Sequence, residues 1–85
     1  MKSNTVIWWP PAQDDLTLVW IDSDDRQAIA DAANEIERVL GLATADVGSA
    51  VHEGMRQLIV RPLLVQFVVD EGDRKVTILS VKKVI

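Results

Sequence analysis

The stretch MRQLIVRPLLVQFVVDEGDRKVTILSV, residues 55–81, decides the fold of this chain. Residues 55–60 and 63–70 are apolar runs of strand length, and the Arg61-Pro62 pair between them predicts a turn, because proline disfavours a helical residue before it. Leu63, Val65 and Phe67 alternate with a more polar set, so one face of this strand is apolar and the other is mixed. DEGD, residues 70–73, is typical of a hairpin turn.

The last predicted strand covers residues 74–84. Strict alternation places Val76, Ile78 and Ser80 on one face and Thr77, Leu79 and Val81 on the other. Both faces carry apolar residues, which is typical of a strand in the middle of a sheet.

The first half of the chain predicts one strand and two helices. Residues 4–9, NTVIWW, are β-branched and aromatic and predict a strand that Pro10 and Pro11 end. Apolar residues then recur at helical spacing before and after the acidic segment DSDDRQ, in which Asp22 or Ser23 is the expected cap of the second helix. The helical residues expected to face the core are Leu16, Val19, Trp20, Ile29, Ile36, Val39 and Leu40. Residues 42–54 are small and polar and predict a loop.

The resulting order is β-α-α-β-β-β. We expect an α+β fold in which a helical hairpin packs on one face of a mostly antiparallel four-stranded sheet. The 85 residues predict a single domain, residues 1–85.

Composition excludes several classes of protein. Cysteine is absent and His52 is the only histidine, so thiolate and multi-histidine metal sites are excluded, and the sequence predicts no metal and no cofactor. No apolar run approaches the roughly 20 residues of a membrane helix, and the N-terminus lacks a signal-peptide pattern, so we expect a cytoplasmic protein with no membrane partner.

Charge is divided unevenly along the chain. The net charge of −4 disfavours nonspecific binding of nucleic acid. Residues 51–85, however, hold six bases against four acids, a net charge of +2, which leaves room for one local basic patch.

The element order and two local segments resemble the RelE/ParE toxins of bacterial type II toxin–antitoxin (plasmid stabilisation) systems. PPAQDDLTLVW resembles the first helix of that family, and GMRQLIVRPLLVQFVVDEGDRKVTILSV resembles its sheet. The resemblance covers roughly residues 5–83. It implies a cytoplasmic protein neutralised by a cognate antitoxin protein, with either the ribosome or DNA gyrase as a large target: RelE-like members cleave messenger RNA on the ribosome, whereas ParE-like members inhibit gyrase.

This chain departs from the pattern of the nuclease branch, which carries clustered Lys and Arg with a Tyr or His near the C-terminus. It has no tyrosine, and Leu63 or Leu64 stands where the resemblance implies a sheet arginine. The weak catalytic candidates are His52, Arg56, Arg61 and Lys83. The candidate binding residues are Arg56, Arg61, Lys82, Lys83, Trp8 and Trp9.

Three functions remain open from the sequence. One is a toxin that acts by binding a large protein target, as ParE does. Another is a ribosome-dependent ribonuclease, in which cations stabilise the phosphate charge and His52 moves a proton. The third is an attenuated member that only binds a partner protein. A tryptophan, Trp8 or Trp9, is expected at the partner surface or at a homodimer contact. For these residues, core packing or an interface is a commoner role than stacking on nucleotide bases.

Overall fold

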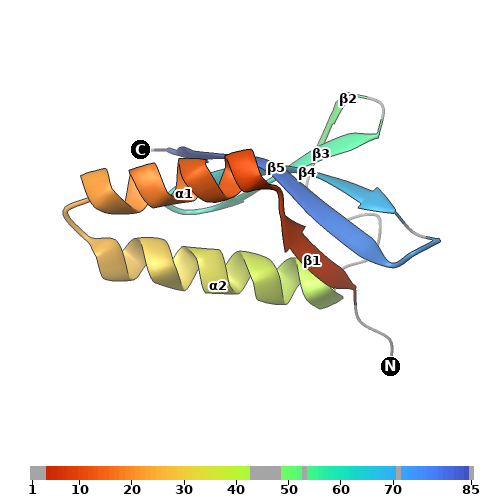
Figure 1. Ribbon diagram of the computed structural model, residues 1–85, viewed down its shortest axis with the longest axis horizontal. Coiled ribbons are helices and arrows are strands. Elements are labelled where there is room, and N and C mark those ends of the chain that lie inside the picture. Colours follow the sequence, from red (N-terminus) through yellow and green to blue (C-terminus); the bar gives the residue numbers. More distant parts are fainter. Residues whose placement is uncertain (1–3, 43–48, 53, 71, 85) are drawn as a thin grey trace.

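The structure is a computed structural model that describes residues 4–42, 49–52, 54–70 and 72–84. Its elements are, in order, β1 (Thr5–Trp8), α1 (Pro10–Asp22), α2 (Arg26–Leu42), β2 (Ser49–His52), β3 (Met55–Val60), β4 (Leu63–Asp70) and β5 (Lys75–Lys83). Figure 1 shows the two helices side by side and antiparallel, in a layer against the sheet.

The sheet has the strand order β1-β5-β4-β3-β2. β1 runs parallel to β5, and the other neighbouring pairs are antiparallel. The predicted α+β fold, with a helical hairpin on a mostly antiparallel sheet, is therefore confirmed. The structure adds one short strand, β2, within residues 42–54, where the sequence predicted only a loop. Residues 49–52 are extended because they pair with the edge of β3; residues 43–48 and 53 of that segment lie outside the described residues.

The helix boundaries follow local chemistry. α1 begins with Pro10 and Pro11, whose fixed φ suits the first turn of a helix. α2 begins later than the sequence suggested, because Asp25 is the residue that caps it: its Oδ1 accepts a hydrogen bond of 3.0 Å from the backbone N–H of Ala28. Ser23 instead accepts a hydrogen bond from the backbone N–H of Asp25, so it orders the turn between the helices.

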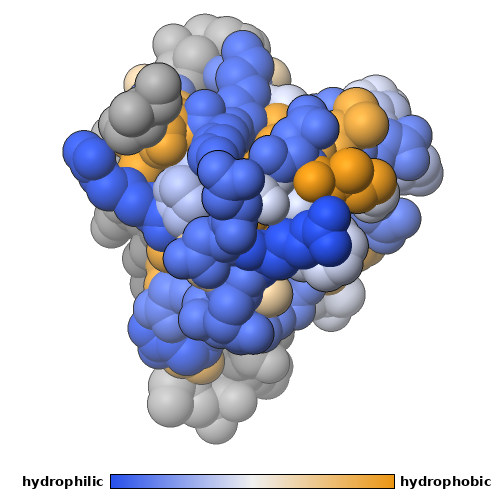
Figure 2. Space-filling view, turned by 90° about the vertical axis from the view of Figure 1, so that its left-hand side faces the viewer, coloured by the Kyte–Doolittle hydropathy of each residue, from blue (hydrophilic) through white to orange (hydrophobic). Residues whose placement is uncertain are grey.

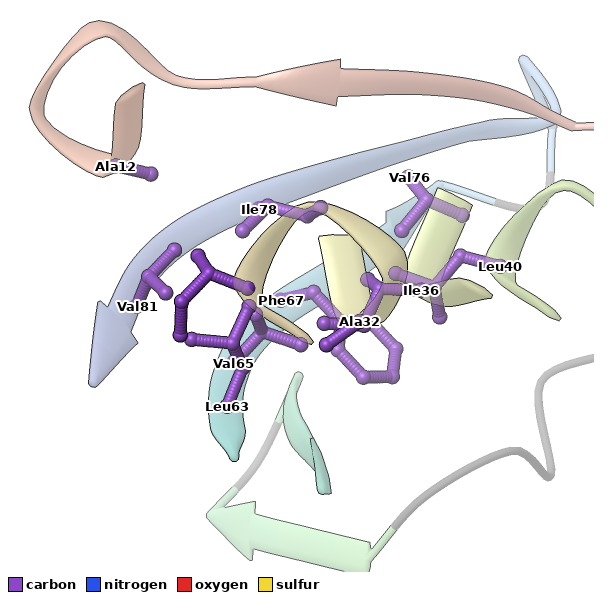
Figure 3. Packing of buried hydrophobic residues seen from close by; sticks show 11 residues of the cluster. Ala12, Ala32, Ile36, Leu40, Leu63, Val65, Phe67, Val76, Ile78 and Val81 are labelled. Carbon is purple, nitrogen blue, oxygen red and sulfur yellow. The ribbon is translucent and has the colours of Figure 1, made fainter. Parts of the chain in front are cut away.

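The hydrophobic core lies between the helices and one face of the sheet. Figure 3 shows side chains of α2, β4 and β5 pointing toward one another in this layer. Its buried residues are Ala12, Ile29, Ala32, Ile36, Leu40, Leu63, Val65, Phe67, Val76, Ile78 and Val81. Ile29, Ile36 and Leu40 are buried as predicted, and Leu16 and Val19 pack against the cluster. The prediction was wrong for Trp20, which is 42% exposed.

A β-bulge changes which residues of β5 point toward the core. Gln66 pairs with Ser80 and Phe67 pairs with Ile78, so Leu79 is an extra residue opposite β4. Beyond the bulge the alternation is shifted by one residue, and Val81 rather than Ser80 joins the core. The predicted alternation is therefore correct up to Ile78 and wrong at Ser80 and Val81.

Asp15 holds α1 against the bulged part of β5. Its Oδ2 accepts a hydrogen bond of 3.4 Å from the backbone N–H of Val81. We expect Asp15→Ala to lower the free energy of unfolding by about 1 kcal/mol, because a backbone donor in a buried residue loses its partner. Asp15→Asn keeps an acceptor oxygen and should lose less. Denaturant titration measures both changes, and an equal loss in the exposed neighbour variant Asp14→Ala would contradict this role.

Candidate protein-binding groove

The predicted basic residues lie on three elements. Arg56 is in β3, directly opposite Phe67 of β4, and Arg61 is exposed in the turn between these strands. Five residues of extended chain separate Arg56 from Arg61, which corresponds to about 16 Å. Arg56 therefore lies near the start of β3, and Arg61 directly follows its end.

The two lysines of β5 diverge. Lys82 pairs with Leu64 and Lys83 with Leu63. Neighbouring residues of a strand point to opposite faces, and Leu63 belongs to the core beneath the helices. Lys83 therefore lies on the helix side of the sheet and Lys82 on the open side, so the two do not form one patch.

Arg61 and Lys83 both line a shallow hollow of about 400 Å³ beside the turn that joins α1 to α2. Its other lining residues are Ser23, Asp24, Asp25, Ala28 and Pro62. Figure 2 shows that the end of the molecule with this turn is largely hydrophilic. Two carboxylates share the hollow with the two cations and weaken the positive potential that a polyanion would meet.

His52 belongs to β2, where it pairs with Met55. The structure describes its backbone only, so its proposed role in proton transfer stays a prediction. Among the described residues, no three His, Asp or Glu side chains lie close enough to hold a metal ion. In the part of the chain that the structure describes, no helix is long and apolar enough to cross a membrane.

A second and larger depression is a groove between the two helices, with a volume of about 530 Å³. We call it the helix groove; its lining residues are Trp8, Gln13, Leu16, Thr17, Trp20, Ile29, Ala30, Ala33, Asn34 and Glu37. The α1 residues recur at i, i+3, i+4 and i+7, so they form one continuous stripe along the helix. Small side chains of α2, Ala30 and Ala33, leave the space between the helices open.

Two side-chain contacts hold residues of the helix groove in place. The indole Nε1–H of Trp8 donates a hydrogen bond of 2.7 Å to Glu37 Oε1, which joins β1 to α2. The guanidinium of Arg26 lies 4.6 Å from the centre of the Trp20 ring, a cation–π contact. Arg26 also donates a hydrogen bond to the carbonyl of Ile21, at the end of α1. Trp8 and Trp20 are thus held in position while they line the groove.

α1 and the residue before it expose apolar side chains in addition to those that face the core. Besides Trp20, the exposed ones are Leu18 at 62%, Ile21 at 52% and, just before the helix, Trp9 at 50%. The sequence predicted an interface role for Trp8 or Trp9 but missed Trp20. The sequence did carry a signal for this exposed apolar surface. Residues 16 and 18–21 are all apolar, which is more apolar residues than an amphipathic helix needs on its single buried face.

The architecture was compared with known proteins. No protein-family model matches the chain, and no curated protein matches it in sequence. Solved structures do match along nearly the whole chain. A chain of the toxin–antitoxin complex RelBE2 from Mycobacterium tuberculosis superposes with a TM-score of 0.79 at 20% identity, over 98% of this chain and 93% of that one. The chromosomal ParDE toxin–antitoxin system of P. aeruginosa gives a TM-score of 0.71 at 17% identity, over 96% and 97%.

The isolated E. coli RelE toxin matches with a TM-score of 0.68 at 12% identity, over 96% of this chain and 85% of that one. The chain has the RelE/ParE toxin fold. The resemblance drawn from the sequence is supported by these structures, including its extent along the chain.

On this RelE/ParE fold, the basic candidates are dispersed, and of the two tryptophan candidates Trp8 lines the helix groove whereas Trp9 does not. Arg61 and Lys83 share the hollow beside the turn between the helices, whereas Arg56 and Lys82 lie elsewhere on the sheet. Trp8 and Trp20, by contrast, line the same groove from different elements. The geometry suits contact with an apolar segment better than contact with a phosphate chain.

Proposed function

We propose that this chain is the toxin-like component of a bacterial type II toxin–antitoxin system and that it acts by binding proteins. The observation that carries the proposal is the open apolar helix groove on a RelE/ParE fold. RelBE2 is a toxin–antitoxin complex and ParDE is a toxin–antitoxin system, which supports a cognate antitoxin as the first partner of this chain.

The helix groove is the proposed antitoxin surface. An amphipathic helix laid between two antiparallel helices inserts side chains at i, i+3, i+4 and i+7. Here Leu16 and Trp20 supply apolar walls beside Ala30 and Ala33. Burying apolar surface is worth about 25 cal/mol per Å², so covering this groove and the exposed Trp20 stabilises a complex without any charged contact.

For the cellular target, the dispersed cations favour a ParE-like mode, in which DNA gyrase is bound, over RNA cleavage. A ribonuclease needs several donors aimed at one phosphate. Of the basic candidates, Arg61 and Lys83 line one hollow, and Asp24 and Asp25 line it with them. RelE-like cleavage of messenger RNA is the second candidate, and its case rests on that pair of cations.

Co-expression with the product of the neighbouring open reading frame tests the antitoxin proposal. We expect higher soluble yield and a complex that copurifies, because the exposed apolar groove becomes covered. A cell expressing the chain alone should grow poorly, and co-expression should restore growth. If the isolated chain is monomeric, stable and harmless, and no partner copurifies, the proposal is wrong.

A further inference from the structure

The helix groove lies in the most acidic part of the molecule. The helical hairpin, residues 10–42, holds eight acids and two bases, a net charge of −6. Glu37 lines the groove itself. Asp14 and Asp31 are exposed and do not line the groove; each lies about 100° around its helix from the lining residue before it, Gln13 or Ala30.

Both bases of the hairpin are engaged within it. Arg38 forms an ion pair with Glu35, with 2.6 Å between Nη2 and Oε2, and this contact lowers the pKa of the Glu35 carboxyl. Arg26 stacks on Trp20 and donates a hydrogen bond to the Ile21 carbonyl. Among the described residues, neither base forms an ion pair with Asp14, Asp31 or Glu37. Arg26 keeps its positive charge beside Trp20, so a segment entering the groove meets an apolar floor, the Glu37 carboxylate and one cation, within a hairpin of net charge −6.

We propose that the natural occupant of the helix groove is a cationic amphipathic helix, with a narrow apolar stripe flanked by Lys or Arg. This inference rests on the proposed function, because it specifies the antitoxin segment that would bind there. Opposite charges on the flanks raise the association rate and exclude acidic competitors, and salt weakens both effects. The helical hairpin of a second copy of this chain is disfavoured as an occupant, because two hairpins that each carry a net charge of −6 repel.

The test uses two synthetic helical peptides and the full chain. Both peptides carry leucine at i, i+3, i+4 and i+7; one has lysines on its flanks and the other has glutamates at the same positions. Binding is followed by tryptophan fluorescence and by calorimetry at about 50 mM and about 500 mM NaCl, where the screening length falls to roughly a third. We expect the lysine peptide to bind at least about tenfold more tightly at low salt, and the difference to shrink at high salt.

A matched variant assigns the preference to the groove. Asp14→Asn, Asp31→Asn and Glu37→Gln together remove three charges, and the amide that replaces the Glu37 carboxylate keeps an oxygen that accepts the Trp8 hydrogen bond. We expect this variant to keep its thermal midpoint and to bind the two peptides within about twofold of each other. An unchanged preference in the variant, tighter binding of the glutamate peptide, or no binding of either peptide would overturn the inference.

The inference and the proposed function can fail separately. If the adjacent gene product copurifies but the peptides show no charge preference, only the cationic assignment is wrong. If the lysine peptide is preferred and no antitoxin exists, the groove chemistry stands and the toxin–antitoxin proposal fails.

Discussion

Replacing Ile36 with alanine should lower the free energy of unfolding by about 2–4 kcal/mol. Ile36 is fully buried and lies in the middle of the α2 stripe, among core residues of α2 and the sheet (Figure 3). A chain of this length has a total stability of roughly 5–10 kcal/mol, so this single change removes a large part of it. Urea titration, monitored by far-UV circular dichroism, measures the loss.

Ile21→Ala is the matched control, since it makes the same chemical change at a helical residue that is 52% exposed. We expect it to change the free energy of unfolding by less than about 0.5 kcal/mol. A loss below that value for Ile36→Ala would mean that the stripe faces water and that the layer arrangement of helices on the sheet is wrong.

The second large effect concerns binding. Ala30→Trp should weaken the complex with the proposed antitoxin by about 100-fold, or about 2.7 kcal/mol. Ala30 is half-buried and lines the helix groove, so an indole there occupies the space that the partner side chains need. Calorimetric titration of the purified chain with the antitoxin measures the affinity.

Leu18→Trp is the control for this change. It adds an indole to an exposed position of α1 that does not line the helix groove. We expect both variants to keep the thermal midpoint of the parent and only Ala30→Trp to lose affinity. If Ala30→Trp binds the antitoxin as tightly as the parent does, the partner occupies another surface, such as the open face of the sheet.

The main elements were predictable because their patterns are long. The alternation of Leu63, Val65 and Phe67 identified β4, and the stripe from Ile29 to Leu40 identified α2; both segments face the core as expected. Such patterns repeat several times, so one irregular residue does not hide them.

The errors occurred where tertiary context overrides the local pattern. β2 has four residues without strong alternation, and it forms at the free edge of β3. The bulge at Leu79 moved Val81 to the core, a shift that no periodicity in the sequence reveals. Trp20 is apolar and at helical spacing, but it lines the groove beside Arg26 instead of entering the core.

The candidate site was less predictable than the fold. From the sequence, the cations could be chosen only by residue type. In the structure, strand register separates Arg56 from Arg61 and places Lys82 and Lys83 on opposite faces of the sheet. The groove arises from the distance between two helices and from small residues on one of them, which only the packed structure defines.

The central claim is that this chain acts by binding a protein and does not cleave RNA. Its most direct test is induction of the chain alone in a bacterial host, with mapping of messenger RNA ends and a gyrase supercoiling assay on the purified protein. The account predicts a growth defect with intact messages and inhibited supercoiling. Exposed single ion pairs contribute only about 0.2–1 kcal/mol, so Lys83→Ala, at an exposed position, should weaken the effect modestly. Cuts at codon positions that vanish in Arg56→Ala would contradict the account.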